Sequence, residues 1–354
     1  MSLPAHGGAL AAWLQRQWWR PRPTLGARLL QPLSWLYRGL AALHRRRNAA
    51  PADRGPGEVP VVVVGNLIVG GAGKTPSVIA LVRWLRDTGW TPGVISRGYG
   101  RGTDAVAQVQ PGLGAAHGGD EPLLIQLRTG VPVWVGADRV ATLAALRAAH
   151  PAVDIVVSDD GLQHHRLRRD VQLVVFDERG AGNGLLLPAG PLREPLPPAL
   201  PPRTLVLYNA PAASTPLPGF LARRSLAGVT PLADWWAATD GAAQPLHALQ
   251  GRPLHAAAGI ASPERFFGML EAAGLAIERL PLPDHHDFAT LPWPRDAEVV
   301  ITEKDAVKLR PDRLPPGQRV WVATLDFPLP PGLAAALQPL LPPPPSGCPA
   351  PPAP

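Results

Sequence analysis

Residues 59–76 read VPVVVVGNLIVGGAGKTP, and this stretch decides the fold of the chain. Its β-branched run over 59–64 is typical of a strand buried in a parallel sheet. The segment that follows, SVIALVRWLRDTG over 77–89, carries its apolar side chains at helical spacing. A strand, a glycine-rich turn and a helix in this order predict a phosphate-binding loop.

The turn supplies the groups that phosphate binding needs. Its glycines let the backbone approach phosphate oxygens, and successive backbone N–H groups then point at the anion. We expect Lys74 to reach the β- and γ-phosphates and Thr75 to offer its hydroxyl to Mg²⁺. The strict pattern has glycine at the position of Ile68, so this loop is a variant, and an ordinary strand–helix turn is the alternative. The predicted phosphate-binding residues are Ile68, Val69, Gly70, Gly71, Ala72, Gly73, Lys74 and Thr75.

A second apolar strand, VDIVVSDDG over 153–161, ends in two aspartates. A carboxylate at the carboxyl end of a strand beside a phosphate loop is where P-loop enzymes hold Mg²⁺ or its water. We therefore expect Asp159, with Asp160 beside it, to contribute to a magnesium site. The alternative is that Asp-Asp-Gly only forms a turn.

Strands and helices alternate along most of the chain, which predicts an α/β fold of the P-loop NTPase type, with helices on both faces of a parallel sheet. Candidate strands cover residues 59–64, 92–96, 131–135, 153–158, 171–176 and 204–208. A smaller α/β block follows. The predicted organisation is a basic, Trp-rich helical segment over 1–48, a P-loop domain over 55–229, a smaller domain over 230–340 and a disordered Pro-rich tail over 341–354.

Composition restricts the partners. The net charge of +7 over 354 residues favours anionic partners, among them phosphate compounds, anionic lipid and nucleic acid. The single cysteine, Cys348, excludes a disulfide framework. No run of 18 apolar residues exists, so no simple membrane span is predicted, and no secretory signal is expected.

The N-terminal segment differs from the rest of the chain. Residues 1–48 contain four tryptophans and no acidic residue, and leucines recur in steps of four and three from Leu29 to Leu43. This spacing predicts an amphipathic helix from Pro32 to about Arg45. Such a helix is roughly 20 Å long, which is shorter than a ~30 Å hydrocarbon core, so it would lie in the membrane interface. The alternative is that the leucines pack on the protein's own core.

Other charged motifs allow two interpretations each. ISRGYGR over 95–101 and GPLREP over 190–195 fit anion or nucleotide contacts, or ordinary loops. In HGGDEPLLIQL, Asp120 taken alone favours a helix N-cap. The adjacent histidines of PDHHDF, over 283–288, point in different directions and so form no two-ligand metal face. TEKD over 302–305 is close to the guanine-reading motif of GTPases, but its residue order argues against guanine.

Together these motifs resemble one family, the tetraacyldisaccharide 4′-kinases of Gram-negative bacteria. The resemblance covers residues 30–310 and rests on PLSWLY, GNLIVGGAGKTP, SRGYGR, GDEPLL, VGADR, SDDGLQHHRLRRD, GPLREP, AGIASPERFF, PDHHDF and TEKDAVKL. It implies phosphorylation of the 4′-hydroxyl of an acylated glucosamine disaccharide 1-phosphate, with ATP and Mg²⁺, at the cytoplasmic face of the inner membrane. The family's loop shares the variant pattern, so Ile68 is no departure from it.

The resemblance also implies residue roles. The family's catalytic pair is an aspartate from its GDE motif and a histidine from its DHH motif, which by position are Asp120 and His285. Asp120 would accept the hydroxyl proton, and His285 would orient Asp120 or share the proton, with His286 as the alternative histidine. The expected partners are the lipid substrate and an anionic membrane surface, with no nucleic acid. The expected substrate-binding residues are Arg97, Tyr99, Glu121, Arg139, Arg193 and Glu194.

Two other functions fit parts of the sequence. A soluble P-loop NTPase switch, such as a metal-delivery GTPase, would share the phosphate loop, but the N-terminal helix and the order of TEKD argue against it. A membrane-binding scaffold with an inactive nucleotide site would share the N-terminal segment. The intact Lys74, Thr75 and Asp159 argue against the scaffold.

Overall fold

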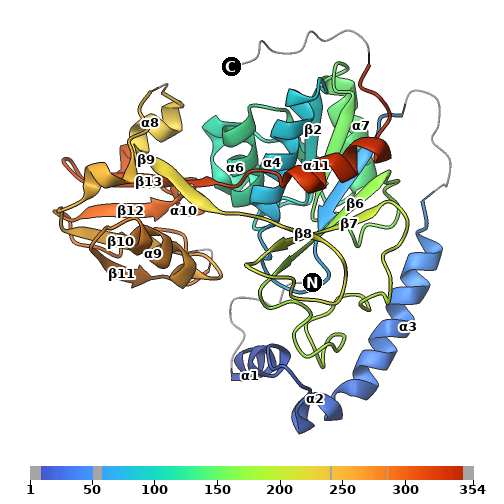
Figure 1. The fold of residues 1–354 in the computed structure, drawn as a ribbon. Coiled ribbons are helices and arrows are strands. Elements are labelled where there is room, and N and C mark those ends of the chain that lie inside the picture. The colour runs from blue at the N-terminus through green and yellow to red at the C-terminus, as the bar shows by residue number, and fades with distance from the viewer. Residues whose placement is uncertain (1–8, 51–57, 240, 285, 346–354) are drawn as a thin grey trace. The chain divides into compact units, whose positions relative to one another are not determined.

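The computed structural model of the chain describes residues 9–50, 58–239, 241–284 and 286–345. The chain divides into two compact units (Figure 1). The first unit comprises residues 1–97, 138–223 and 329–354, and the second comprises residues 98–137 and 224–328.

The first unit is built on a parallel sheet in which every strand pairing is parallel. All residues of the two strands at its centre are buried, as expected for a sheet covered on both faces. Helices α4 (Lys74–Asp87), α7 (Arg139–Ala149) and α11 (Pro331–Leu337) pack against the strands. The strand order is β2 (Pro92–Ser96), β5 (Ile155–Asp159), β1 (Val61–Gly65), β6 (Val171–Asp177), β7 (Thr204–Asn209) and β8 (Phe220–Leu221).

The α/β fold class is confirmed, and the predicted strands lie within two residues of the observed ones. Long apolar runs predict these strands well because a parallel strand buried on both faces needs apolar side chains at every position. The parallel register pairs Val64 of β1 with Asp159 of β5, so the aspartate reaches the same edge of the sheet as the start of the phosphate loop.

Three helices precede the sheet, and they are blue in Figure 1: α1 (Ala9–Trp18), α2 (Leu25–Leu29) and α3 (Gln31–Arg47). The helix predicted from Pro32 to about Arg45 is confirmed as α3. Helices α1 and α2 lie in the segment predicted as helical over 1–48, although their bounds were not predicted. Pro32 lies in the first turn of α3, where its missing N–H costs no hydrogen bond. No helix within the described ranges combines the length and the apolar content that crossing a membrane requires.

The two faces of α3 have different environments. The inner face is held to residues 186–194: the Ser34 hydroxyl donates to the Leu186 carbonyl at 2.8 Å, and the Tyr37 hydroxyl donates to the Arg193 carbonyl at 2.9 Å. The outer face carries the leucine stripe from Leu33 to Leu43, and Leu29, the last residue of α2, precedes it. The stripe's relative exposures are 82% for Leu29, 53% for Leu33, 61% for Leu36, 58% for Leu40 and 45% for Leu43. The alternative in which these leucines pack on the protein's core is therefore wrong.

The second unit holds a five-stranded sheet in the order β11 (Ile277–Pro281), β10 (Leu254–Ala258), β12 (Glu298–Thr302), β13 (Arg319–Asp326) and β9 (Ser225–Pro231). Its pairings are parallel except that of β13 with β9. Helix α9 (Pro263–Ala272) packs on β10 and β9. Helices α6 (Asp120–Thr129) and α10 (Glu303–Ala306) and the antiparallel pair β3 (Ala107–Gln108) and β4 (Val133–Val135) complete the part that concerns function.

The division into units differs from the continuous boundaries expected from the sequence. Residues 98–137 belong to the second unit, where Arg128 of α6 forms an ion pair with the buried Glu303 of α10. Helix α11 belongs to the first unit, where Leu333 and Leu337 are fully buried. Local composition does not show that the chain leaves a unit and later returns to it, so these discontinuous boundaries could not be predicted from the sequence. Of the predicted tail, residues 346–354 lie outside the described residues.

Candidate active site

The phosphate loop occupies residues 66–73, between the end of β1 and the start of α4. Gly73 caps α4 with a φ of +82°, and Gly70 has a φ of +88°. A Cβ atom on Gly73 would lie 1.9 Å from Nδ2 of Asn209, so no larger residue fits there. The backbone of this variant loop therefore has the left-handed turns that its glycines predict.

Four side chains donate hydrogen bonds to the backbone carbonyl groups of the loop. Because C=O and N–H point in opposite directions across a trans peptide, the N–H groups of residues 71–74 face away from these donors. Four inward-facing N–H groups in succession form an anion-binding nest at a helix N-terminus. The four bonds are Asn66 Nδ2 to Gly70 O at 2.9 Å, Arg179 Nη2 to Gly71 O at 2.6 Å, Asn209 Nδ2 to Ala72 O at 3.4 Å and Ser77 Oγ to Gly73 O at 2.9 Å.

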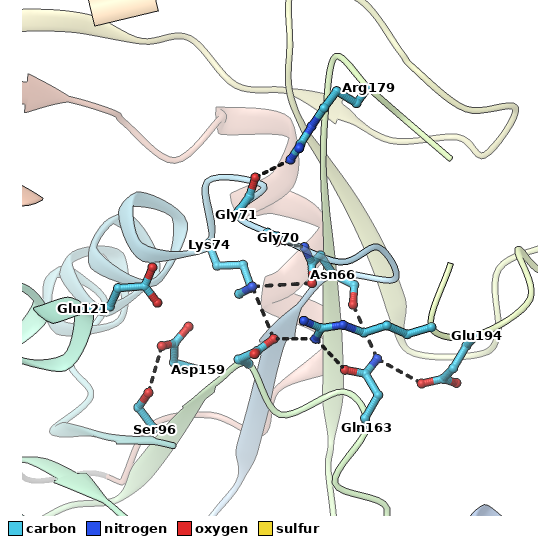
Figure 2. Close-up of polar contacts among 12 residues, drawn as sticks. Asn66, Gly70, Gly71, Lys74, Ser96, Glu121, Asp159, Gln163, Arg179 and Glu194 are labelled. Carbon is cyan, nitrogen blue, oxygen red and sulfur yellow. Dashed lines mark hydrogen bonds and ion pairs between the residues drawn. The ribbon is translucent and has the colours of Figure 1, made fainter. Parts of the chain in front are cut away.

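Lys74 lies at the mouth of the loop in a network of charges (Figure 2). Its Nζ is 3.3 Å from a carboxylate oxygen of Asp160 and 3.4 Å from Oδ1 of Asn66. Arg193 Nη1 is 3.4 Å from the same Asp160 oxygen. Burial by itself raises the pKa of the Asp160 carboxyl, but Lys74 and Arg193 outweigh it and hold that pKa below its ordinary value. Asp160 is thus an ionised partner of two cations.

Asp159 is buried at the end of β5 and accepts a hydrogen bond from the Ser96 hydroxyl at 3.0 Å. Arg139, at the start of α7, is also buried and interacts electrostatically with Asp159 and Asp160. Burial lowers the pKa of the Arg139 guanidinium, the two aspartates oppose that shift and Arg97 adds to it. Arg139 therefore lies within electrostatic reach of Arg97 and of the two strand-end carboxylates.

A chain of hydrogen bonds extends this network toward α3. Arg193 Nη1 donates to Oε1 of Gln163 at 3.2 Å, and Gln163 Nε2 donates to Oε1 of Glu194 at 3.0 Å (Figure 2). Glu194 also pairs with Arg45 of α3 at 3.4 Å. The structure thus joins Arg193 and Glu194 to Lys74 and Asp160. Gln163 is a connecting residue that the sequence analysis missed, although it lies in the SDDGLQHH string.

The oxygen groups near the loop fit a magnesium ion that has ATP phosphates as further ligands. Thr75 is in the first turn of α4, and Asp159 presents a hard carboxylate at the adjacent strand end. Mg²⁺ in phosphoryl-transfer sites uses one or two carboxylates together with substrate phosphates and water. Within the described part of the chain, no cluster of three or more His, Cys, Asp or Glu residues suited to a metal is found.

In the second unit, α6 begins at Asp120 and its N-cap is Gly119, with a φ of +88° and no side-chain cap. Asp120 is therefore not the N-cap, contrary to the interpretation favoured by its local sequence. Asp120 and Glu121 both lie in the first turn of α6, where the positive end of the helix dipole stabilises carboxylates.

Lys304 connects the two motifs expected to supply the catalytic pair. Its Nζ is 3.3 Å from Glu121 and 3.6 Å from Asp284. Burial lowers the pKa of the Lys304 ammonium, but Glu121 and Asp284 outweigh it, and the pKa is raised. These two acids adjoin Asp120 and His285 in the sequence. His285 itself lies outside the described residues. The TEKD motif was interpreted as evidence against guanine and as part of the family resemblance, but this role of Lys304 was not predicted from it.

His286 takes part in a local turn. Its Nδ1 accepts a hydrogen bond from the Phe288 backbone N–H at 3.0 Å, and the two rings lie 4.7 Å apart. Because Nδ1 is an acceptor, the proton of the neutral ring is on Nε2. These contacts hold His286 in a turn of PDHHDF, and the choice of His285 over His286 as the catalytic histidine stays a prediction.

Comparison with known proteins decides the family. A family model described as tetraacyldisaccharide-1-P 4′-kinase (LpxK) matches residues 26–342. The chain belongs to this family. It is 54% identical to a tetraacyldisaccharide 4′-kinase of Methylibium petroleiphilum over 334 residues, which is 93% of each chain. It is 52% identical to one of Leptothrix cholodnii over 338 residues, which is 94% of this chain and 97% of that protein.

A solved structure supports the same assignment. The crystal structure of LpxK from Aquifex aeolicus in complex with ATP matches with a TM-score of 0.69 and 25% sequence identity, over 90% of this chain and all of that chain. The resemblance drawn from the motifs and the P-loop kinase fold are both confirmed. Membership of the tetraacyldisaccharide 4′-kinase family removes the reasons for considering a metal-delivery GTPase or an inactive scaffold.

The predicted site residues of this family member fall into two groups. The first unit brings together the phosphate loop, Asp159, Asp160, Arg97, Arg139, Arg193 and Glu194. The second unit contains Asp120, Glu121 and the half-exposed Tyr99. The donors Asn66, Arg179 and Asn209 were missed, although Arg179 and Asn209 have the signal of lying at or just after a predicted strand end.

Proposed function

We propose that this protein transfers the γ-phosphoryl group of ATP to the 4′-hydroxyl of a tetraacylated glucosamine disaccharide 1-phosphate, a step of lipid A biosynthesis. The observation that carries the proposal is the nest of N–H groups at residues 71–74, with each carbonyl of residues 70–73 accepting a side-chain hydrogen bond, in a chain of the tetraacyldisaccharide 4′-kinase family. In the transfer the bond between the bridging oxygen and Pγ breaks, and a bond between the 4′-oxygen and Pγ forms.

The first unit supplies the groups for phosphate binding. The N–H groups of residues 71–74 bind the phosphate oxygens, and Lys74 exchanges its contact with Asp160 for the β- and γ-phosphates. Arg193 then remains as a partner of Asp160, so the carboxylate stays neutralised when Lys74 moves. Mg²⁺ bound by Thr75 and Asp159 would offset the negative charge that develops on the transferred group.

The second unit supplies the acid–base pair in this proposal. Asp120 accepts the proton of the 4′-hydroxyl as the new bond forms, and His285 orients Asp120 or shares that proton. Support comes from the match of GDE and PDHHDF to the family's catalytic motifs and from Lys304, which contacts the neighbours of both residues. The arginines Arg97, Arg139 and Arg193, with Tyr99, Glu121 and Glu194, are proposed to bind the phosphorylated sugar.

The exposed leucine stripe, Leu29 of α2 and four leucines of α3, supports an enzyme that associates with a membrane, and the family to which the chain belongs suggests the cytoplasmic face of the inner membrane. Each of the five leucines is at least 45% exposed, while the opposite face of α3 is held to residues 186–194. An acylated disaccharide leaves a bilayer at a cost of about 0.8 kcal/mol per exposed CH₂, so the enzyme must work at the interface. The arginines at 45–47 would contact lipid phosphates.

The activity is tested with the purified full chain, ATP labelled at the γ-phosphate and a tetraacylated disaccharide 1-phosphate in detergent micelles. We expect label in the lipid that survives mild acid, because mild acid cleaves an anomeric phosphate and spares a 4′-phosphate. The same disaccharide with its 4′-hydroxyl blocked is the control. Release of labelled phosphate at the same rate with and without the lipid would instead identify an NTPase.

The leucine stripe gives a prediction for membrane binding. Replacing Leu33, Leu36 and Leu40 together with glutamate should reduce co-sedimentation with anionic vesicles at least tenfold, because burying each leucine contributes about 1.5–3 kcal/mol when complete. Leu113→Glu, at a leucine of 52% exposure in the second unit, is the matched control and should bind vesicles normally. Unchanged sedimentation of the triple variant would refute the interfacial role of α3.

A further inference from the structure

Arg179 joins the phosphate loop to the end of strand β6. Its Nη2 donates to the Gly71 carbonyl at 2.6 Å, and its Nε and Nη2 contact one oxygen of Asp177 at 2.9 and 2.6 Å (Figure 2 shows the contact with Gly71). A Cβ atom on Gly70 would lie 3.8 Å from Nη1, which is ordinary van der Waals contact. The guanidinium therefore lies directly against the backbone of residues 70–71.

The same guanidinium stacks on the N-terminal segment. Its central carbon lies 4.4 Å from the centroid of the Trp19 ring, within the range of a cation–π contact. Trp19 directly follows α1, and its place is set by the residue before it. The buried Trp18 donates its indole N–H to the Pro188 carbonyl at 2.8 Å, and the Trp18 carbonyl accepts from Asn183 N at 2.8 Å.

We propose that Trp19 and Arg179 form a positioning link through which the N-terminal segment sets the orientation of the Gly71 carbonyl and hence the affinity of the loop for ATP. The inference deepens the proposed function and rests on it only in that the loop binds ATP. Neither residue is assigned a part in the chemical step.

The peptide between Gly71 and Ala72 needs such a holder. Ala72 is buried, but Gly71 has no side chain and a Cβ atom built on it would meet nothing within 4 Å, so packing restrains this peptide at Ala72 and not at Gly71. A charged donor forms a stronger bond to a carbonyl than a neutral one does. Asp177 holds the guanidinium at its edge, and Trp19 holds it at its face. When the carbonyl is fixed, the N–H of Ala72 is already oriented for phosphate and ATP binding costs less ordering.

The close packing of Trp18 and Trp19 also explains why residue 182 is a glycine. A Cβ atom on Gly182 would come within 2.4 Å of the Trp18 carbonyl oxygen and 3.2 Å of the Trp19 ring. The loop after β6 therefore approaches the N-terminal segment so closely that it has no space for a side chain. Trp18, Trp19 and Arg179 behave as one packed contact between that segment and the phosphate loop.

The test measures ATP affinity of the full chain without lipid, by titration with a fluorescent ATP analogue and competition by ATP. Arg179→Gln should raise the dissociation constant about tenfold, and Trp19→Leu about threefold to tenfold, while Trp19→Phe, which keeps an aromatic face, should stay near the wild type. Arg179→Lys keeps the charge but loses the fork that reaches Asp177 and Gly71 together, so it should also bind weakly. Turnover at saturating ATP should change less than the dissociation constant.

Trp236→Leu is the matched control. This substitution removes the same type of contact in the second unit, where the central guanidinium carbon of Arg310 lies 4.6 Å from the centroid of the Trp236 ring. It should leave ATP affinity unchanged. Normal ATP affinity in Trp19→Leu, or an equal loss in Trp236→Leu, would overturn the link. If Trp19→Leu unfolds, Arg179→Lys still tests the arginine half of the link, and normal ATP affinity in that folded variant would overturn it. The predicted order of affinities in a protein that phosphorylates no lipid would uphold the link and refute the proposed function.

Discussion

Asp120→Ala is expected to lower kcat by about 10²–10⁴-fold, the range for loss of a positioned acid–base group, with little change in KM for ATP. The reason is that the carboxylate accepts the hydroxyl proton only as the phosphoryl group moves, so ground-state ATP binding does not depend on it. Steady-state kinetics with the lipid substrate and ATP measure both constants. Asp120→Asn is the conservative companion, which keeps the size of the side chain and removes the base.

The variant is expected to remain folded. Gly119, not Asp120, is the N-cap of α6, so alanine removes no cap; it removes the attraction of Asp120 to Lys304 and a favourable interaction with the helix dipole, the latter worth about 0.3–1 kcal/mol. Thermal melting separates the two effects. An Asp120→Ala enzyme that keeps its turnover and melts at a lower temperature would show that the carboxylate is structural and that another group is the base.

The histidine pair distinguishes chemistry from structure within the same experiment. His285→Ala should lose kcat to a similar extent, and the Asp120→Ala/His285→Ala double variant should be little worse than the poorer single variant, because groups that act as a unit are not additive. His286→Ala should be much milder and act on stability, since Nδ1 of His286 accepts the Phe288 N–H. If His286→Ala is inactive and His285→Ala is active, then His286 is the catalytic histidine and His285 is not.

The second large effect concerns the phosphate loop, where Lys74→Ala is expected to lower activity by about 10²–10³-fold, the usual result of removing one donor to developing charge. The fold should survive, because Asp160 is still paired with Arg193. In the wild type, Lys74 and Arg193 lower the pKa of Asp160, so its contribution to stability is lost only as the pH falls through that lowered value; in Lys74→Ala the pKa should be higher, and the loss should begin at a higher pH. Activity at saturating ATP and thermal melting are the measurements.

Lys74→Arg and Thr75→Ala complete this test. Arginine keeps the charge but not the compact ammonium, so Lys74→Arg should recover little activity if geometry matters as well as charge. Thr75→Ala removes a proposed magnesium ligand, and its loss should be partly relieved by raising the magnesium concentration. Near-normal turnover of Lys74→Ala at saturating ATP would remove the phosphate-loop assignment.

Much of the fold followed from local sequence patterns. The buried strands β1, β5 and β6 were recognisable because parallel strands covered on both faces need apolar runs. The phosphate loop was recognisable because its glycines, Lys74 and Thr75 are contiguous, so one short string contains most of the chemistry. The stripe of α3 was recognisable because helical periodicity appears in the sequence whatever lies on the other face of the helix.

The sequence by itself determined the phosphate loop, the strand-end aspartates and the amphipathic helix, since each depends on residues close together in the chain. Only the tertiary structure decided what holds the loop. Asn209 and Arg179 are 137 and 108 residues from the carbonyls that they hold. Every residue has a backbone carbonyl, so the sequence of the loop does not indicate which distant side chain will donate to it. The assignment of residues 98–137 to the second unit was also a tertiary decision, because the ion pair of Arg128 with Glu303 spans 175 residues. Local patterns record the covalent neighbourhood of a residue, whereas these contacts depend on how distant strand ends and helices meet when the chain folds.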